Sequence, residues 1–218
     1  TAGGTVLWKD INPASASSSP RNFTVFNNRL FFTARTAANG EEMWEVDLGD
    51  ARATLYKEFV PGSGSPDISS IQVVGKYMYV VADAILYSTE ANGALSTPPL
   101  CVLHSTVGRG TLMPWESTLY FAGYTPQHGY ELWRTDGALG GTYMVSDLVP
   151  GPESSYPGGG ASVSSEPDLG GAGVESKLIF RASVAENNHQ LWATDGTTHG
   201  TVQLTNFPVT PGEFGNDI

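Results

Sequence analysis

The chain has 218 residues with 22 acidic and 11 basic side chains, which give a formal net charge of −11. This charge disfavours nucleic acid or an anionic membrane as partner and is compatible with cation binding or with solubility alone. The single cysteine, Cys101, excludes an intrachain disulfide, and no apolar run approaches the ~20 residues of a membrane helix, so we expect no membrane insertion.

Four copies of one pattern follow one another along the chain, each anchored on an aromatic residue that comes after Leu or Met. The anchors are Trp44, Tyr87, Trp133 and Trp192. Each copy contains short runs typical of strands, and no segment shows helical periodicity. Four-stranded units that repeat every ~40–50 residues are typical of β-propeller blades. We therefore predict an all-β, propeller-like array of four antiparallel blades in a single domain, 1–218.

The predicted blades follow the repeat boundaries 14–60, 61–105, 106–150 and 151–207. In chain order, the expected strands cover 22–26, 29–34, 42–46 and 54–59; 70–74, 77–81, 85–88 and 100–103; 111–115, 118–122, 130–133 and 142–145; and 177–182, 190–192 and 201–204. The fourth copy should begin with a further strand between Val163 and Val174, after a stretch rich in Gly, Pro and Ser. Large residues in the second strands should fill the spaces between blades.

The segment 1–13 matches the fourth strand of a repeat without the three strands that should precede it. We expect this surplus strand to belong to a preceding blade, if the sequence is cut from a longer array, or to complete a blade in a neighbouring chain.

Two hairpins carry the most regular sequence. Each has an Asp-Gly turn, at Asp136-Gly137 and Asp195-Gly196, followed by a Gly-Thr pair that opens the next strand. Glycine adopts positive φ at little steric cost, and the Asp carboxylate can accept hydrogen bonds from amides of its own loop. A structural role therefore explains both aspartates. Calcium bound jointly with backbone carbonyls remains an alternative, although the Asp and Asn spacing of a calcium loop is missing.

These hairpins resemble the bacterial ELWxxDGT repeat family. The third copy matches most closely, with Glu131-Leu-Trp133, Asp136-Gly137 and Gly141-Thr142, and the other copies match in part. The resemblance implies an exported or cell-surface protein with a propeller-like fold and no agreed catalytic activity. The surplus strand leads us to expect further repeats of the same protein, or other protein chains, as partners.

Residue chemistry leaves two functional hypotheses. The first is a non-enzymatic extracellular module for structure or interaction, with glycans as a possible ligand of aromatic side chains; its binding candidates are Trp44, Tyr87, Trp133, Asp136, Trp192 and Asp195. The alternative is a polysaccharide hydrolase, with two carboxylates from different blades meeting in the channel. No catalytic residue, metal ligand or cofactor is singled out. Asn22 begins an Asn-Phe-Thr glycosylation pattern, and His128 is expected to stabilise a turn.

Overall fold

The structure is a computed structural model that describes residues 4, 7, 9–13, 16–49, 52–90, 93–103, 112–164, 177–185 and 188–208. Within these residues the chain forms four antiparallel sheets, each of four strands in sequence order, and no α-helix. Thus the all-β class and the fourfold repetition are confirmed.

Each sheet is a meander that lies within one predicted repeat. The first sheet contains β1 (Arg21–Phe26), β2 (Arg29–Thr36), β3 (Gly40–Asp47) and β4 (Arg52–Lys57). The second contains β5 (Ile68–Val74), β6 (Tyr77–Ala82), β7 (Ile85–Glu90) and β8 (Cys101–Val102). The third contains β9 (Met113–Trp115), β10 (Thr118–Thr125), β11 (Gly129–Thr135) and β12 (Tyr143–Ser146). The fourth contains β13 (Gly158–Ser164), β14 (Lys177–Ala185), β15 (Asn188–Thr194) and β16 (Val202–Gln203).

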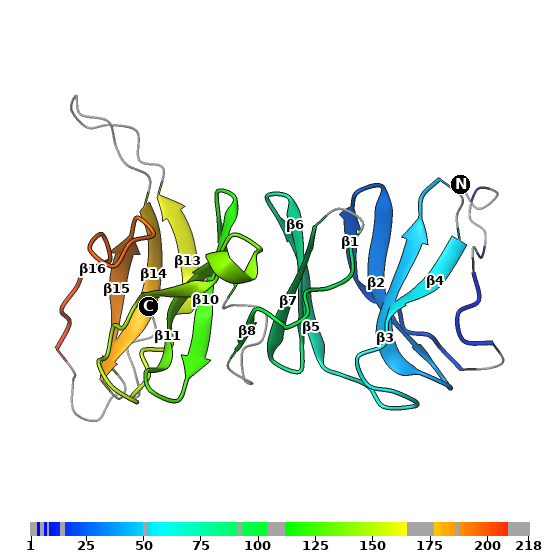
Figure 1. Ribbon diagram of the computed structural model, residues 1–218, viewed down its shortest axis with the longest axis horizontal. Coiled ribbons are helices and arrows are strands. Elements are labelled where there is room, and N and C mark those ends of the chain that lie inside the picture. Colours follow the sequence, from blue (N-terminus) through cyan, green and yellow to red (C-terminus); the bar gives the residue numbers. More distant parts are fainter. Residues whose placement is uncertain are drawn as a thin grey trace.

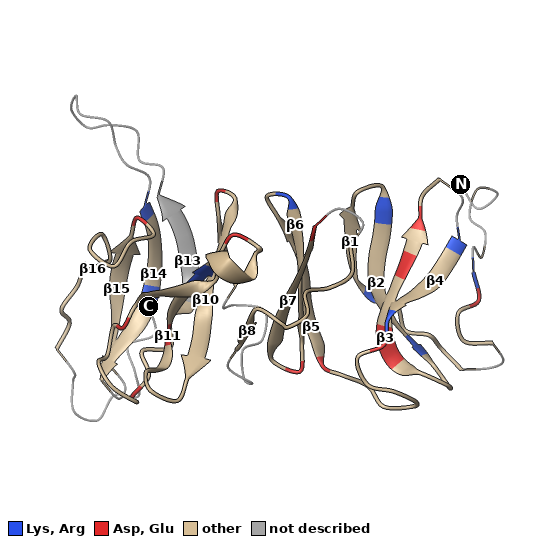
Figure 2. Cartoon of the chain, in the orientation of Figure 1, with Lys and Arg blue, Asp and Glu red and all other residues tan. Residues whose placement is uncertain are grey.

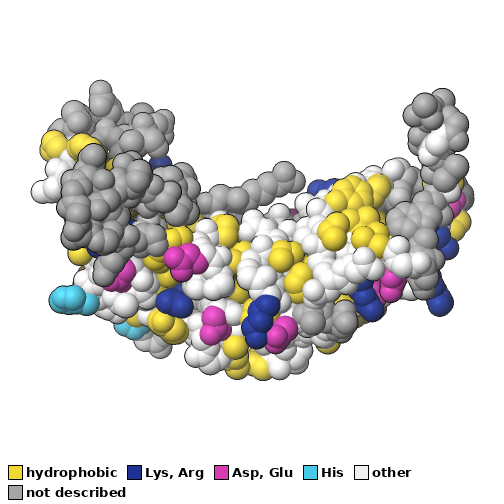
Figure 3. Space-filling view, turned by 90° about the horizontal axis from the view of Figure 1, so that it is seen from above, with side chains coloured by type: hydrophobic (Ala, Val, Ile, Leu, Met, Phe, Trp, Pro, Cys, Tyr) yellow, Lys and Arg dark blue, Asp and Glu magenta, His cyan; other side chains and the backbone are white. Residues whose placement is uncertain are grey.

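The four sheets stand in a row along the longest axis of the molecule, in chain order, with the first and fourth sheets at opposite ends (Figure 1). The view from above shows that the row is bent into an arc that is convex along one long side (Figure 3). Within the described residues, the sheets thus lie face to face with their neighbours in an open row and form no closed ring (Figure 1 and Figure 3).

Two strands differ from their predicted positions or lie partly outside the described residues. The first strand of the fourth copy begins earlier than predicted, because β13 starts at Gly158 inside the glycine-rich stretch and pairs with β14 from Gly158↔Arg181 to Ser164↔Lys177. The surplus strand predicted over 1–13 lies partly outside the described residues. Its described residues form no strand, but Ile11 packs against the first sheet beside Phe32, Ala34 and Val46.

Strand alternation gives every sheet an upstream face, turned toward the preceding sheet, and a downstream face, turned toward the next. In β6, for example, Val80 packs against the first sheet and Tyr79 against the third. In β10, Phe121 packs against the second sheet and Tyr120 against the fourth. Three apolar cores of this kind join the four sheets, and together they hold most of the fully buried large side chains.

The Asp-Gly hairpins of the third and fourth sheets have the same internal hydrogen bonds. In the third, the hydroxyl of Thr135 accepts from the Gly137 amide at 3.0 Å and lies 2.7 Å from the hydroxyl of Thr142. In the fourth, the hydroxyl of Thr194 accepts from the Gly196 amide at 2.9 Å and lies 2.7 Å from that of Thr201. The repeated sequence therefore encodes one repeated turn.

Each of these hairpins also contacts the preceding sheet. The carbonyl of Gly137 accepts a buried 2.6 Å hydrogen bond from Ser88 of β7, and its Cα lies against the ring of Tyr77. In the fourth sheet, the Thr198 hydroxyl donates to the carbonyl of Val145 at 2.5 Å. The hairpins therefore fix how one sheet sits on another.

Charged residues lie mainly at strand ends and in connecting loops (Figure 2). In the first sheet, Arg29 at the start of β2 pairs with Glu45 of β3 at 2.7 Å. Among the residues that the structure describes, no helix has the length and apolar character needed to cross a membrane.

We expect Gly137→Ala to destabilise the protein by about 1–3 kcal/mol, because Gly137 has φ +98° and an added Cβ would lie 2.1 Å from the Tyr77 ring. Gly140→Ala in the same hairpin is the control, since no heavy atom lies within 4 Å of its added Cβ, and its effect should stay below about 0.5 kcal/mol. Denaturant unfolding measures both. Equal effects would show that the hairpin does not depend on this close contact.

Candidate functional site

The four anchor aromatics lie on the upstream faces of their sheets. Tyr87 packs in the core between the first and second sheets, Trp133 in the next core and Trp192 in the third. Trp44 packs with Phe32 and Val46 on the outer face of the first sheet, and its indole NH donates to the carbonyl of Ala34 at 3.2 Å. The structure thus distributes these aromatics over four separate places and does not bring them together in one site.

The two turn aspartates bind amides of their own loops. Asp136 accepts from the amide of Ala138 at 3.0 Å, and Asp195 accepts from both the amide and the hydroxyl of Thr197, at 2.9 and 2.7 Å. The hydrogen bonds from Thr197 lower the pKa of Asp195. In the described part of the chain, no group of three or more His, Cys, Asp or Glu side chains is placed to hold a metal ion.

Asn22 and His128 also make contacts within the fold. The side-chain amide of Asn22 donates to the carbonyl of Ile68 in the second sheet at 3.0 Å, so a glycan on this nitrogen would displace a contact between sheets. His128 precedes β11, and its Nδ1 lies 2.8 Å from Oδ2 of Asp147 after β12. This pair connects the turn before β11 to the segment that leaves the same sheet.

A buried polar group recurs just before the anchor aromatic. Glu42 accepts from the amides of Phe59 and Val60 at 2.9 and 3.0 Å. Glu131 accepts from the amide of Leu148 at 2.8 Å and from the amide and hydroxyl of Ser155 at 3.0 and 2.7 Å. In each case a carboxylate with no exposed surface holds the segment that leads to the next sheet.

Gln190 takes this position in the fourth sheet. Its side-chain oxygen accepts from the amide of Phe207 at 2.9 Å, and its nitrogen donates to the carbonyl of the same residue at 3.0 Å. In the fourth sheet, an uncharged side chain therefore holds the segment that follows the sheet. Burial raises the pKa of Glu131 to about 7, against the opposing effect of its three hydrogen bonds, and it also raises the pKa of Glu42.

The raised pKa of Glu131 predicts a pH dependence of stability. Because the folded-state pKa of about 7 lies above the ordinary value of 4.5, the folded state binds the proton more tightly than the unfolded state. The resulting stabilisation is fully present below the unfolded value and is lost as the pH rises through the folded value. As the pH rises from 4.5 to about 7, the free energy of unfolding should fall by roughly 2–3 kcal/mol less in Glu131→Gln than in the wild type.

Denaturant titrations on both sides of this pH window provide the measurement. Glu153→Gln is the control that removes an exposed carboxylate, so that the loss of one acidic side chain is separated from the loss of the buried carboxylate. An identical pH slope for Glu131→Gln and the wild type would contradict the assignment to Glu131.

Cys101 is a free, half-buried thiol at the start of β8. Burial raises its pKa to about 11 from an ordinary value of 9.0. Because the thiolate is the reactive form, we expect alkylation near neutral pH to be about a hundredfold slower in the native protein than in denaturant. Time-resolved labelling with iodoacetamide, followed by intact-mass measurement, tests this. Equal rates in the two conditions would show that the thiol is accessible.

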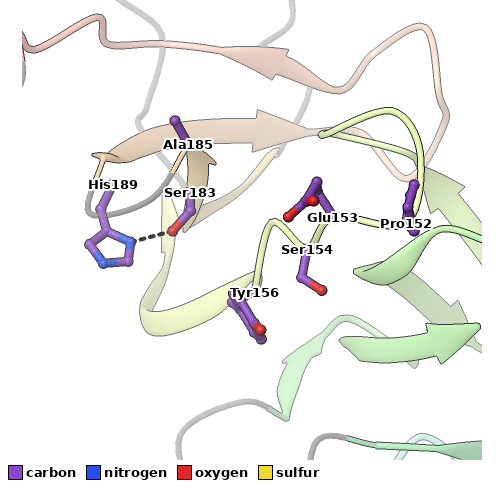
Figure 4. Close-up of a pocket in the computed structure, with 7 residues that line it drawn as sticks. All are labelled: Pro152, Glu153, Ser154, Tyr156, Ser183, Ala185 and His189. Atoms are coloured by element: carbon purple, nitrogen blue, oxygen red, sulfur yellow. Dashed lines mark hydrogen bonds between the residues drawn. The ribbon is translucent and has the colours of Figure 1, made fainter. Parts of the chain in front are cut away.

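A cavity with polar side chains lies where the third sheet passes to the fourth (Figure 4). It has a volume of about 510 Å³, within the range of small-ligand sites. The connection after β12 supplies one side of the cavity, and β14 and β15 supply the other. The lining residues are Pro152, Glu153, Ser154, Tyr156, Ser183, Ala185 and His189.

Backbone contacts hold the two sides of this pocket together. The amide of Ser183 donates to the carbonyl of Ser155 at 2.7 Å, which ties β14 to the connection. The hydroxyl of Ser154 accepts from the Tyr130 amide at 3.0 Å, and Gly129, with φ +65°, passes so close to Glu153 that an added Cβ would lie 2.2 Å from its carbonyl oxygen. The geometry of the pocket is therefore set by the same contacts that join two sheets.

The pocket combines polar groups with exposed aromatic surface. Ser183 and His189 are directly opposite each other on β14 and β15, and Oγ of the serine lies 2.8 Å from Nδ1 of the histidine. Tyr156 stacks on Tyr130 with ring centroids 5.6 Å apart, and Tyr130 in turn lies 4.7 Å from Tyr124. Such a surface offers hydrogen bonds to hydroxyl groups and a ring face to an apolar patch of a ligand.

The repeat pattern did not identify this pocket. Its residues fall at positions where the copies differ, since the cross-strand pair Ser183↔His189 of the fourth sheet corresponds to Tyr124↔Tyr130 in the third and to Arg35↔Glu41 in the first. A signal was present in the sequence as three tyrosines, at 124, 130 and 156, around the most regular repeat.

Comparison with known proteins gives no family assignment. No model of a known protein family matches the chain, and no curated protein sequence matches it.

Proposed function

We propose that the protein is a non-enzymatic, exported interaction module of stacked, propeller-like β-sheets that binds neutral polysaccharide in the pocket between the third and fourth sheets. The exposed, stacked ring of Tyr156 beside the polar groups of Ser183 and His189 carries this proposal. The resemblance of the hairpins to the ELWxxDGT repeat family supports an exported or cell-surface location.

Aromatic rings and hydroxyl-binding groups suit a sugar because a pyranose has an apolar face of C–H groups and a rim of hydroxyls. In the pocket, the Tyr156 ring can cover such a face while Glu153, Ser154 and His189 reach the rim. The net charge of −11 favours a neutral glycan over an anionic one.

The regular residues of the repeats support the non-enzymatic part of the proposal. Asp136, Asp195, Glu42 and Glu131 all accept hydrogen bonds from main-chain amides near the ends of their strands, so their recurrence is explained by folding. A catalytic pair of carboxylates would need one group with a raised pKa in an open pocket. Glu131, whose pKa is raised, is instead enclosed without exposed surface.

We expect Tyr156→Ala to weaken binding to soluble neutral polysaccharides by about tenfold, because a stacked aromatic contact contributes on the order of 1 kcal/mol beyond its buried area. Affinity electrophoresis in gels that contain xylan, galactomannan or mixed-linkage β-glucan measures the effect, with alginate as the anionic comparison. Tyr143→Ala is the matched control, since Tyr143 is a comparably exposed tyrosine of β12 outside the pocket. Binding of the wild type to none of the neutral polymers, or release of reducing sugar from any of them, would overturn the proposal.

A further inference from the structure

Each interface between neighbouring sheets joins the downstream face of one sheet to the upstream face of the next. The two end sheets of the arc each have one such face that no other described sheet covers. The first sheet presents its upstream face and the fourth sheet its downstream face, with three complete interfaces between them (Figure 1). From this geometry we infer that two copies of the chain associate head to tail, with the downstream face of the fourth sheet of one copy packed on the upstream face of the first sheet of the other.

The upstream face of the first sheet has the composition of an internal interface. Phe32, Ala34 and Val46 form its apolar centre, with Leu30, Trp44 and Ala53 around them. The corresponding positions in the other sheets are filled by residues that pack on a preceding sheet, such as Val80 and Phe121 for Phe32. A shallow apolar groove of about 160 Å³ runs over this face, lined by Phe23, Leu30 and Phe32 among others.

The exposure of equivalent residues in the first and second sheets shows that no sheet covers the upstream face of the first. Phe23 stands at the same distance before the first hairpin turn as Ile71 does before the turn of the second sheet. Ile71 is buried against the first sheet with 8% of its surface exposed, whereas Phe23 stacks on Phe32 and keeps 59% exposed. A neighbouring sheet in the internal arrangement would therefore cover Phe23.

The downstream face of the fourth sheet shows the complementary difference. Leu132 and Val145 are fully buried on the downstream face of the third sheet, in contact with the fourth. Their counterparts after the same hairpin residues are Leu191, which is half-buried, and Leu204, which is exposed. The fourth sheet thus leaves Leu204 exposed, and Leu191 partly exposed, at positions that are buried in the third sheet.

A second copy is the occupant because it supplies both surfaces in the geometry that is already used three times within the chain. The contact is heterologous, since two different faces meet, so association through both ends gives a ring and association through one end gives an open row. Ser183 and His189 of the polysaccharide pocket lie on the same face of the fourth sheet as Leu191, so the association would border the pocket. Phe23 and Leu204 do not line the pocket, so substitutions at these two residues test the association without removing a sugar-binding group.

The association is tested by light scattering coupled to size exclusion over a wide range of protein concentration. We expect a mass of at least twice the 23.1 kDa of one chain at high concentration. Phe23→Ser should shift the protein to the mass of a single chain. Val25→Ser is the matched control on the same face, because Val25 is 61% exposed and its counterpart Val73 stays 41% exposed inside an internal interface.

The head-to-tail geometry has its own test. Leu204→Ser should also give single chains, and a mixture of the Phe23→Ser and Leu204→Ser proteins should recover dimers, because each variant retains the face that the other has lost. Wild-type protein that keeps the mass of one chain at every concentration would overturn the association. Dimers of the Leu204→Ser variant alone, as for a contact between two first sheets, would overturn the geometry.

Discussion

The structure depends on the burial of sheet faces against one another. A single four-stranded sheet has two faces and cannot bury both alone, so each sheet uses its neighbours as its core. Alternation along β6 and β10 sends consecutive large residues to opposite sides, and these residues fill three successive interfaces. The hairpins then fix the stacking, because Gly137 leaves room for the ring of Tyr77 and its carbonyl accepts from Ser88.

The same constraint accounts for the polar residues that recur. A strand that ends at an interface leaves main-chain amides in places where water does not reach, and buried amides need acceptors. Glu42 and Glu131 supply them, and Gln190 shows that an amide side chain can replace a carboxylate when the local donors and acceptors change. The raised pKa of Glu131 is the electrostatic cost of using a carboxylate for this task.

Much of the fold was predictable from the sequence, and the reason is local. The alternating runs and the turns at Asn27-Asn28 and Gly75-Lys76 determine strand pairing with neighbours in sequence, so most of the strands that the structure describes were expected near their observed places. The beginning of β13 was missed, since Gly158 and the glycines after it carry no side chains that indicate a strand. The pocket was missed because it joins residues 152–156 to β14 and β15, and a tertiary contact at variable positions leaves no periodic trace in the sequence.

The hairpin contacts have a consequence for how such a chain can grow. Each repeat carries one surface that fits the sheet before it and another that receives the sheet after it, and the hairpins of the third and fourth sheets keep the same threonine and glycine network. A tandem duplication of the DNA for one repeat would therefore add a unit with the same alternation of faces as its new neighbours. Extension by whole repeats keeps this alternation, whereas loss of part of a repeat would leave two faces without a neighbouring sheet.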